Sequence, residues 1–382
     1  MIWILLKLMF SKWLSIKRWN NFPRVEDITP LDNAGFVIHI ALFMSHLEEK
    51  NWEKIDKKYI IKKIIFELFK SLVLSDINSG TRDYILKINP QIMEELETKV
   101  LNYFLNMNWS EFLKNDIKEI LLDKSNRIEN RIIESAKKFA WHQECVINAR
   151  VFLYAYDVAL DEINDYFDKN KSKLHSLKEL LKNDNYKNYL SHIRRLSHAM
   201  RWSWKNRKYR VSVMSHLVIV TFISYILSNL ENEKWWDYDV FEMMIKSVYH
   251  DIPEAITWDI ITPIKNSVEG FRETLEKVEE KMMDDYFFVY VDNEYKHKIW
   301  DYILNPFSWK AWKLAKNADI ISALLEARIE RDSNNLEFIQ IYRKIKTLVN
   351  NHETYSSDYF LKDVLLSFWD DLEELKIEKI WQ

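Results

Sequence analysis

Residues 238–265 read YDVFEMMIKSVYHDIPEAITWDIITPIK, and the first half of this stretch indicates the fold class. Its apolar side chains recur every three or four positions, the spacing of one face of a helix, at Val240, Phe241, Met244, Ile245, Val248 and Tyr249. Residues 216–230 and 314–328 repeat the pattern, whereas the sequence lacks alternating strand patterns and Asn-Gly hairpin turns. Polar clusters at residues 75–81 and 332–335 mark loops. We therefore expect an all-α fold.

Length and charge limit the class of protein. The chain has 382 residues, which predicts about two or three domains. Lysine and arginine number 55 against 58 aspartates and glutamates, and this net charge of −3 argues against a dedicated nucleic-acid binder. The single cysteine, Cys145, excludes an internal disulfide and a cysteine-rich zinc module.

Glycine is scarce and tryptophan abundant. The chain has 3 glycines and 16 tryptophans, although average usage would give roughly 27 glycines. Glycine-rich phosphate loops, both the P-loop and the dinucleotide-binding fingerprint, are therefore excluded. Turns that need a positive φ must use other residues, or some letters of the sequence are wrong.

The first ten residues, MIWILLKLMF, are apolar apart from Lys7 but far short of the about 20 residues that span a bilayer. Positive charges follow this segment instead of preceding it, and no small-residue cleavage site is present, so it does not resemble a secretory signal. We expect a cytoplasmic protein without a membrane span. The segment is then an apolar N-terminal helix or the product of a start codon placed too early, and an interfacial anchor is the alternative.

A weak internal repeat runs through the chain. AGFVIHIALFMSHLEE (residues 34–49) carries His39 in an apolar helix, as SVMSHLVIVTFISYILSNLE (residues 212–231) carries His216. Asp76 follows His39 at nearly the distance at which Asp251 follows His216. The copies share hydrophobic residues but not polar ones, and a chance similarity between two helical bundles is the alternative reading.

This repeat predicts how the chain divides. We expect an N-terminal extension over residues 1–30, a degenerate helical domain over residues 31–175, and a catalytic domain with C-terminal helices over residues 176–382. Because the first half keeps only His39 and Asp76, we expect no complete metal site there.

The second half places histidine and aspartate where apolar helices have no need of them. His216 begins one helix, His250 and Asp251 end another, and Asp319 lies within a third. Two imidazoles and two carboxylates are a mixed ligand set suited to a divalent metal. Taken singly, a histidine on a helix is more often a core residue, and Asp319 could pair with a lysine.

Together these residues resemble the H…HD…D signature of the HD-domain metal-dependent phosphohydrolases. The stretch HDIPEAITWDIITPIK and the preceding pair Arg201-Trp202 also resemble the HD-domain 5′-deoxynucleotidases, where an Arg-Trp pair and HD-x-x-E-x-x-x-x-D-x-x-x-P-x-K recur. The resemblance covers residues 190–330 and implies an HD-domain helical bundle, with the first half as a degenerate copy. Trp258, where the family has Gly or a polar residue, and Met214-Ser215, where an acidic residue is common, depart from the pattern.

The resemblance implies a role for each residue. His216, His250, Asp251 and Asp319 would hold one divalent ion, which could be Mn, Co, Fe, Mg, Ni or Zn, and hydroxide on that ion would attack the phosphorus of a monoester. Glu254 would be the general acid or base, and Asp259 would lie at the phosphate end of the substrate. Substrate-binding residues would be Arg201, Trp202 and Lys265.

Some of these roles have rivals in the sequence. Trp202 could equally belong to the core, Lys265 could be a surface lysine, and Arg194 and Arg195 compete with Arg201. The resemblance implies removal of the 5′-phosphate from (deoxy)nucleoside monophosphates. Alternatives are an HD phosphohydrolase for dNTPs or for cyclic or bis-phosphate nucleotides, and a regulatory nucleotide-binding protein. The two halves could imitate a dimer within one chain, or the chain could itself form a dimer.

The shortage of glycine suggests a specific reading of the tryptophans. Some bacteria read UGA as glycine, and translating that codon as tryptophan would turn glycines into tryptophans. Trp258, in the predicted catalytic turn, and Trp235-Trp236, in a polar loop, are positions where glycine would be ordinary. We expect Trp202, inside the Arg-Trp pair, to be a true tryptophan.

Overall fold

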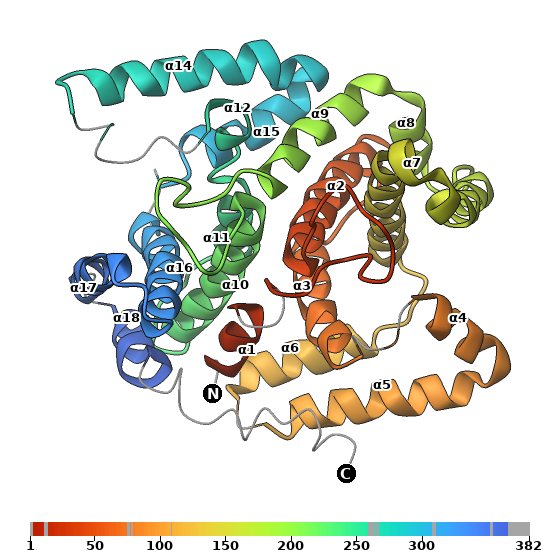
Figure 1. Cartoon of the computed structure of the whole chain (residues 1–382), viewed down its shortest axis with the longest axis horizontal. Coiled ribbons are helices and arrows are strands. Elements are labelled where there is room, and N and C mark those ends of the chain that lie inside the picture. Colours follow the sequence, from red (N-terminus) through yellow and green to blue (C-terminus); the bar gives the residue numbers. More distant parts are fainter. Residues whose placement is uncertain are drawn as a thin grey trace.

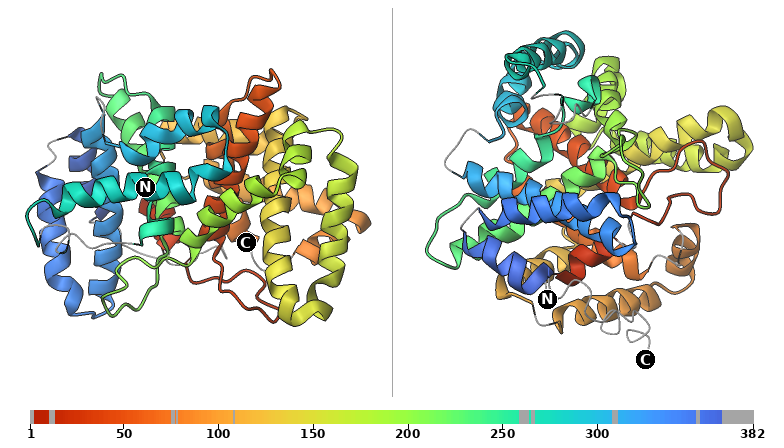
Figure 2. Two further views of the ribbon diagram at one scale, coloured as in Figure 1. Left: turned by 90° about the horizontal axis from the view of Figure 1, so that it is seen from above. Right: turned by 60° about the vertical axis from the view of Figure 1, so that its left-hand side comes forward.

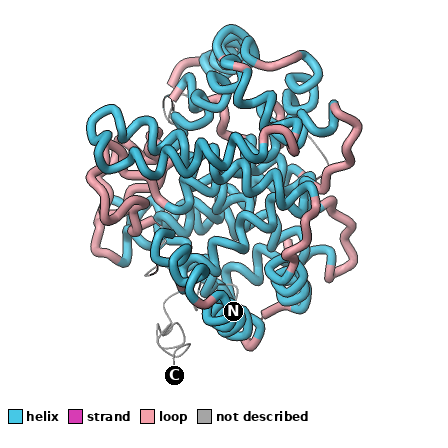
Figure 3. The backbone as a smooth tube through the Cα atoms, turned by 90° about the vertical axis from the view of Figure 1, so that its right-hand side faces the viewer, coloured by secondary structure: helices cyan, strands magenta, loops and turns pink. Residues whose placement is uncertain are grey.

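The computed structural model describes residues 3–10, 14–74, 77, 79–107, 109–258, 264, 267–307, 311–351 and 354–365. Helices make up nearly all of its regular structure, which confirms the predicted all-α fold (Figure 3). Among the described residues, β-structure is limited to one isolated bridge between Met200 and Ser212. The predicted loop at residues 332–335 is confirmed, since a helix ends at Asp332.

The helices of the first half are α1 (Trp3–Leu8), α2 (Pro30–Lys50), α3 (Lys57–Val73), α4 (Ser79–Ile88), α5 (Pro90–Leu105), α6 (Glu111–Leu122), α7 (Ile128–Asn170) and α8 (His175–Lys182). Those of the second half are α9 (Asp184–Arg194), α10 (Val213–Asn232), α11 (Val240–Tyr249), α12 (Glu254–Thr257), α14 (Phe271–Tyr286), α15 (Asn293–Leu304), α16 (Trp312–Asp332), α17 (Glu337–Asn350) and α18 (Tyr355–Tyr359). Helix α7 is kinked at Phe152, where φ is −123° and ψ is 50°.

Two long helices, α2 and α10, form the centre of the molecule and pack against each other (Figure 1). Helix α2 also packs against α3 and α7, and α10 packs against α11 and α16. The two groups of helices therefore lie side by side, as the view from above also shows (Figure 2). Most side chains of both central helices are buried, which explains why their sequences are apolar on nearly every face.

Polar side chains fix where the central helices begin. Thr29 caps α2 in a capping box with Asp32, and Ser212 caps α10 by accepting a hydrogen bond from the amide of Ser215. Asp56 and Asp239 cap α3 and α11 in the same way. These caps set the register of the residues that follow in each helix.

Helix α10 is long and apolar enough to cross a membrane by length and composition alone. It is nevertheless 94% buried inside the protein, as expected for a core helix. The apolar N-terminal segment also lies in the core, because Ile4, Leu5 and Leu6 of α1 are each at most 1% exposed. Burial of both segments within the protein accounts for their apolar composition.

Within the described part of the chain, five tryptophans have a left-handed backbone: Trp19, Trp52, Trp202, Trp235 and Trp258 have φ values between 55° and 84°. A bulky residue rarely adopts this region, which glycine enters without steric cost. The rings of Trp52 and Trp235 are 97% and 98% exposed, and that of Trp258 is 76% exposed. The rings of Trp19 and Trp202, by contrast, pack against the core. The structure thus reveals left-handed backbone at two of the suspected positions, Trp235 and Trp258, and also at Trp202.

Candidate metal centre

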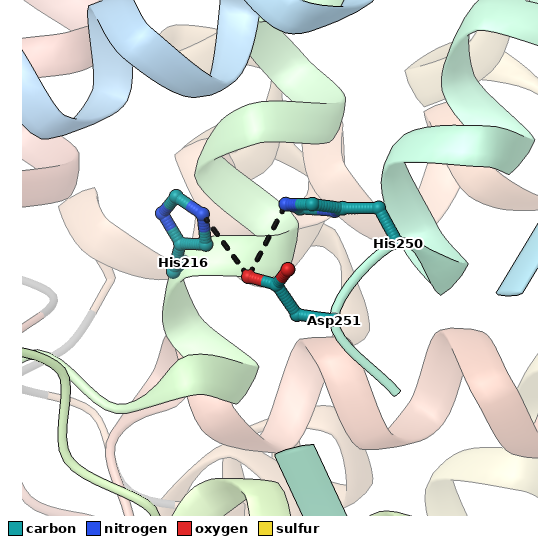
Figure 4. Close-up of side chains that lie close together, drawn as sticks. All are labelled: His216, His250 and Asp251. Carbon is teal, nitrogen blue, oxygen red and sulfur yellow. Dashed lines mark ion pairs between the residues drawn. The ribbon is translucent and has the colours of Figure 1, made fainter. Parts of the chain in front are cut away.

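Three neighbouring helices bring the predicted ligands together. Figure 4 shows three of these ligands, His216, His250 and Asp251. His216 lies in the first turn of α10, just after the Ser212 cap, and is completely buried. His250 directly follows the last residue of α11, and Asp251 is next to it. Asp319 lies in the second turn of α16, which packs against both α10 and α11.

The donor atoms converge on one point. The Nε2 atom of His216 lies 3.6 Å from Oδ2 of Asp251 and 3.3 Å from Oδ1 of Asp319. The Nε2 atom of His250 lies 3.2 Å and 4.0 Å from the same two oxygens. Two ligand atoms that each lie about 2.1 Å from one ion, at right angles to each other, are about 3 Å apart. The observed separations are slightly longer, so a small inward movement of the side chains would let them share a cation.

The second nitrogen of each imidazole orients its ring. Nδ1 of His250 lies 2.9 Å from the carbonyl oxygen of Ser247, and Nδ1 of His216 lies 3.0 Å from the hydroxyl of Ser322. Both Nε2 atoms are buried and make no hydrogen bond of good geometry within the described part of the chain. Donation from Nδ1–H leaves the Nε2 lone pair directed at the cluster, which is the arrangement of a metal-ligating histidine.

The charges of the cluster are mutually stabilising. Although burial opposes ionisation, His250 and His216 hold the pKa of Asp251 well below its usual value. Burial likewise opposes ionisation of Asp319, and Lys316 together with the two histidines lowers its pKa. Burial disfavours the charged form of His250, but the carboxylates of Asp251 and Asp319 raise its pKa overall. The site therefore presents two carboxylates that attract positive charge.

Arg201 connects the cluster to a buried carboxylate. Its Nη1 lies 3.6 Å from Oδ2 of Asp251, and its Nε lies 3.1 Å from Oε1 of Glu326. Burial disfavours the charged guanidinium, but the carboxylates, Glu326 first, then Asp251, Asp319 and Glu254, raise its pKa. Arg201 thus lies beside the cluster, whereas Arg194 pairs with Glu26 at 2.6 Å.

Of the other residues predicted for the site, two lie among the described residues and two do not. Glu254 begins α12, and its charge acts on Arg201. The ring of Trp202 packs against Phe338 of α17, with centroids 5.8 Å apart. Asp259 and Lys265 lie outside the described residues.

Sequence reasoning missed several residues around the cluster. Ser322 and Glu326 face His216 from α16, and Nζ of Lys316 lies 2.6 Å from Oδ2 of Asp319. Lys316 lies three residues before Asp319, and Ser322 and Glu326 lie three and seven residues after it. These spacings put all of them on one face of the helix. A polar stripe along residues 314–328 was therefore the signal in the sequence that could have revealed them.

Comparisons with known proteins cover the second half of the chain. Residues 188–368 match the family model of the YfbR-like 5′-deoxynucleotidases. A 5′-deoxynucleotidase of Yersinia pseudotuberculosis is 25% identical over 195 residues, which are 50% of this chain and 98% of the relative, and one of Yersinia pestis matches to the same extent. The solved structure of an HD-domain phosphohydrolase from Listeria innocua is 25% identical, covers 50% of this chain and 92% of that chain, and has a TM-score of 0.44.

The family match and the His/Asp cluster lie in the same half of the chain. That half carries the ordered set His216, His250, Asp251 and Asp319 on three packed helices. Residues 188–368, which carry His216, His250, Asp251 and Asp319, therefore resemble the YfbR-like 5′-deoxynucleotidases.

Proposed function

We propose that the protein hydrolyses the 5′-phosphate of deoxynucleoside monophosphates, using one divalent metal ion. The observation that carries this proposal is the convergence of two buried Nε2 atoms, those of His216 and His250, on the carboxylates of Asp251 and Asp319. In the reaction, water supplies a new oxygen to phosphorus, the bond between phosphorus and the 5′ oxygen breaks, and that oxygen takes up a proton. The products are a nucleoside and inorganic phosphate.

The donor set accommodates the ion. His216, His250, Asp251 and Asp319 would hold it, and Mn, Co, Fe, Ni and Zn accept such mixed nitrogen and oxygen ligands, whereas Mg prefers oxygen ligands. When bound, a divalent ion lowers the pKa of a coordinated water and neutralises charge on the phosphate. The chain's own part is to keep both Nε2 lone pairs available and both carboxylates ionised.

Arg201 is assigned to binding the phosphate, and Glu254 to transferring the proton. Arg201 keeps its positive charge beside Asp251, where it can bind a phosphate oxygen, while Glu326 holds its Nε edge. Glu254, which lies four residues after His250 and acts electrostatically on Arg201, delivers the proton to the leaving 5′ oxygen.

Three further residues complete the proposed substrate site. Trp202 offers a ring to the sugar or base, while Asp259 and Lys265 are assigned to the phosphate end by the family resemblance alone. For Trp202, packing against Phe338 leaves the ring half-buried and half available. We also propose a cytoplasmic location, in keeping with a nucleotide substrate, and a catalytic domain within residues 176–382.

A panel of substrates tests this proposal. The purified protein, stripped of metal and then given Mn²⁺ or Co²⁺, is incubated with four dNMPs, four NMPs, dNTPs and cyclic dinucleotides, and released phosphate is measured. We expect metal-dependent release from the dNMPs above all. Activity confined to triphosphates or diesters would overturn the substrate assignment, and turnover that persists in excess chelator would overturn the metal-based mechanism.

A further inference from the structure

The two halves of the chain repeat the same helix starts at one constant spacing. Helices α2 and α10 begin 183 residues apart, and so do α3 and α11. The caps match as well: Thr29 and Ser212 cap the first pair, and Asp56 and Asp239 cap the second. A chance similarity of apolar patterns would not also align the capping side chains.

The segments before α2 and α10 are also built alike. An Arg-Trp pair stands at residues 18–19 and again at 201–202, 183 residues later. The amide of Arg18 donates to the carbonyl of Ile28 at 2.9 Å, and the amide of Arg201 donates to the carbonyl of Val211 at 2.9 Å. In both halves this bond ties the Arg-Trp pair to the residue before the helix cap.

Each arginine pairs with a glutamate of a long helix in its own half. Nε of Arg18 lies 3.0 Å from Glu144 of α7, and Nε of Arg201 lies 3.1 Å from Glu326 of α16. One turn further along these helices, the side chains of Asn148 and Glu330 accept hydrogen bonds from the amides of Val25 and Lys208. Because the arginines are 183 residues apart and the carboxylates 182, α7 corresponds to α16.

A third matching contact lies at the far ends of the central helices. Glu48 of α2 accepts a hydrogen bond from the amide of Ser176 in α8 at 2.6 Å. Glu231 of α10 accepts one from the amide of Ser356 in α18 at 2.7 Å. The correspondence thus extends from Arg18 to α8 in the first half and from Arg201 to α18 in the second.

The ligand positions of the first half carry other residues. In this register the counterparts of His216, His250, Asp251 and Asp319 are Asn33, Glu67, Leu68 and Lys137. Glu67 and Lys137 form an ion pair with each other, so a lysine ammonium stands where the second half would place a cation. The first half therefore has a charge-balanced substitute for a metal centre.

This register replaces the one expected from the sequence. His39 is not the counterpart of His216 but lies six residues further along its helix. It packs against the ring of Tyr249, and burial lowers its pKa to about 3, so it stays neutral. Asp76, its expected companion, lies outside the described residues.

The contact between the halves has the symmetry of a homodimer. Asp32 accepts hydrogen bonds from Ser212 and, at 2.8 Å, from Ser215, while the hydroxyls of Thr29 and Ser215 lie 3.3 Å apart. Thr29 corresponds to Ser212, and Asp32 to Ser215. The Asp32–Ser212 contact and the Thr29–Ser215 contact are thus related by exchange of the two halves, as across a two-fold axis.

We infer that the first half is a duplicated copy of the catalytic unit, kept as a built-in, metal-free subunit, and that its Asp32 positions His216 of the catalytic copy. Asp32 bonds both the cap residue of α10 and the residue immediately before His216, and it is only 2% exposed. It is a positioning residue, because it reaches the site only through the first turn of α10. This second part rests on the proposed role of His216 as a metal ligand.

The test compares Asp32→Ala with Asp56→Ala, which removes a helix cap of the same half that lies on α3 instead of at the interface. In metal-free protein, the imidazole NMR signal of His216, assigned with His216→Ala, should shift in Asp32→Ala and stay in place in Asp56→Ala. Binding of Co²⁺, followed by calorimetry, should weaken at least about 10-fold in Asp32→Ala and less than about two-fold in the control. Asp32→Asn, which keeps one acceptor oxygen, should be intermediate and guards against loss of folding.

Each outcome separates this inference from the proposed function. An unmoved His216 signal together with unchanged Co²⁺ affinity in Asp32→Ala overturns the positioning role. Wild-type protein should bind one Co²⁺ and His216→Ala none, and a Co²⁺ retained by His216→Ala would overturn the metal-free first half. If the His216 signal moves but no nucleotide is hydrolysed, the proposed function fails and the positioning role stands.

Discussion

Three exposed tryptophans have a backbone conformation that favours glycine. Trp52 and Trp235 occupy matching turns after α2 and α10, with φ of 67° and 84°. In both turns the following amide bonds back to the carbonyl of a residue five positions earlier, which is the Schellman pattern that usually ends in glycine. Trp258 has φ 65° and ψ 167°, a region that essentially only glycine enters.

We predict that Trp235→Gly stabilises the protein by about 1 kcal/mol, because it removes a left-handed bulky residue whose ring makes little contact. Trp236→Gly is the matched control: it is adjacent and exposed, but its φ is not positive and its ring stacks on Tyr238. Urea unfolding of both variants measures the difference. A Trp235→Gly variant less stable than wild type would contradict the prediction, whereas UGG codons at positions 52, 235 and 258 of the gene would contradict the reading of these tryptophans as glycines.

One surface-facing ion pair has a clear pH signature. Burial raises the pKa of Glu26, but hydrogen bonds from His198 and Arg194 outweigh burial and lower the pKa to about 2, from the usual 4.5. Because the folded-state pKa is lowered, the stabilisation is complete above about pH 4.5 and is lost as the pH falls towards 2.

We expect Glu26→Gln to cost about 1–2 kcal/mol at pH 7, less near about pH 2.5, where the folded-state carboxyl is still partly ionised, and almost nothing below about pH 2. Thermal unfolding of wild type and variant across this pH range measures the cost. A difference between the two proteins that stays constant with pH would show that the charge of Glu26 does not contribute.

Among the elements around the site, helix α16 contributes a buried carboxylate that pairs with two arginines. Glu326 is completely buried and lies 3.1 Å from Arg201 and 3.0 Å from Arg207. Burial opposes its ionisation, but the two arginines lower its pKa to about 2. One carboxylate thus balances two guanidinium groups inside the protein, so removing its charge leaves them uncompensated.

Glu326→Gln should therefore destabilise the protein by about 3 kcal/mol while preserving side-chain shape. The control is Glu337→Gln, whose carboxylate pairs with Lys205 at 3.0 Å but is 46% exposed, and which should cost less than about 1 kcal/mol. Chemical denaturation compares the two. Equal costs for the two variants would mean that the buried charge of Glu326 stabilises the protein no more than an exposed ion pair does.

The elements near the site were predictable because their apolar spacing is regular. Residues 216–230, 238–251 and 314–328 correspond to α10, α11 and α16, with boundaries that differ by only a few residues. Glu326, which pairs with Arg201, and Ser322, which lies by His216, were not foreseen, because they come from a segment more than 100 residues away, whereas the helix caps are local. Sequence spacing within one helix reveals a shared face, but not what that face meets.

At the scale of the whole molecule, the duplication inferred above would account for two similar helical groups that lie side by side (Figure 1). The sequence suggested a repeat with His39 opposite His216, and the inferred register differs from it by six residues, since apolar helices match each other at many offsets. Caps and buried hydrogen bonds, such as those of Glu48 and Glu231, support the inferred register. The four predicted ligands came from residue order and did not depend on that register.

The central claim is that Asp251 and its neighbours hold the metal ion that permits phosphate release. The most direct measurement is Co²⁺-dependent phosphate release from a dNMP by wild type, by Asp251→Asn and by Asp301→Asn, whose carboxylate is exposed on α15. We predict activity in wild type and in Asp301→Asn, and a loss of at least about 1,000-fold in Asp251→Asn, because a ligand and a negative charge disappear together. Asp251→Asn turning over at the wild-type rate would contradict the account.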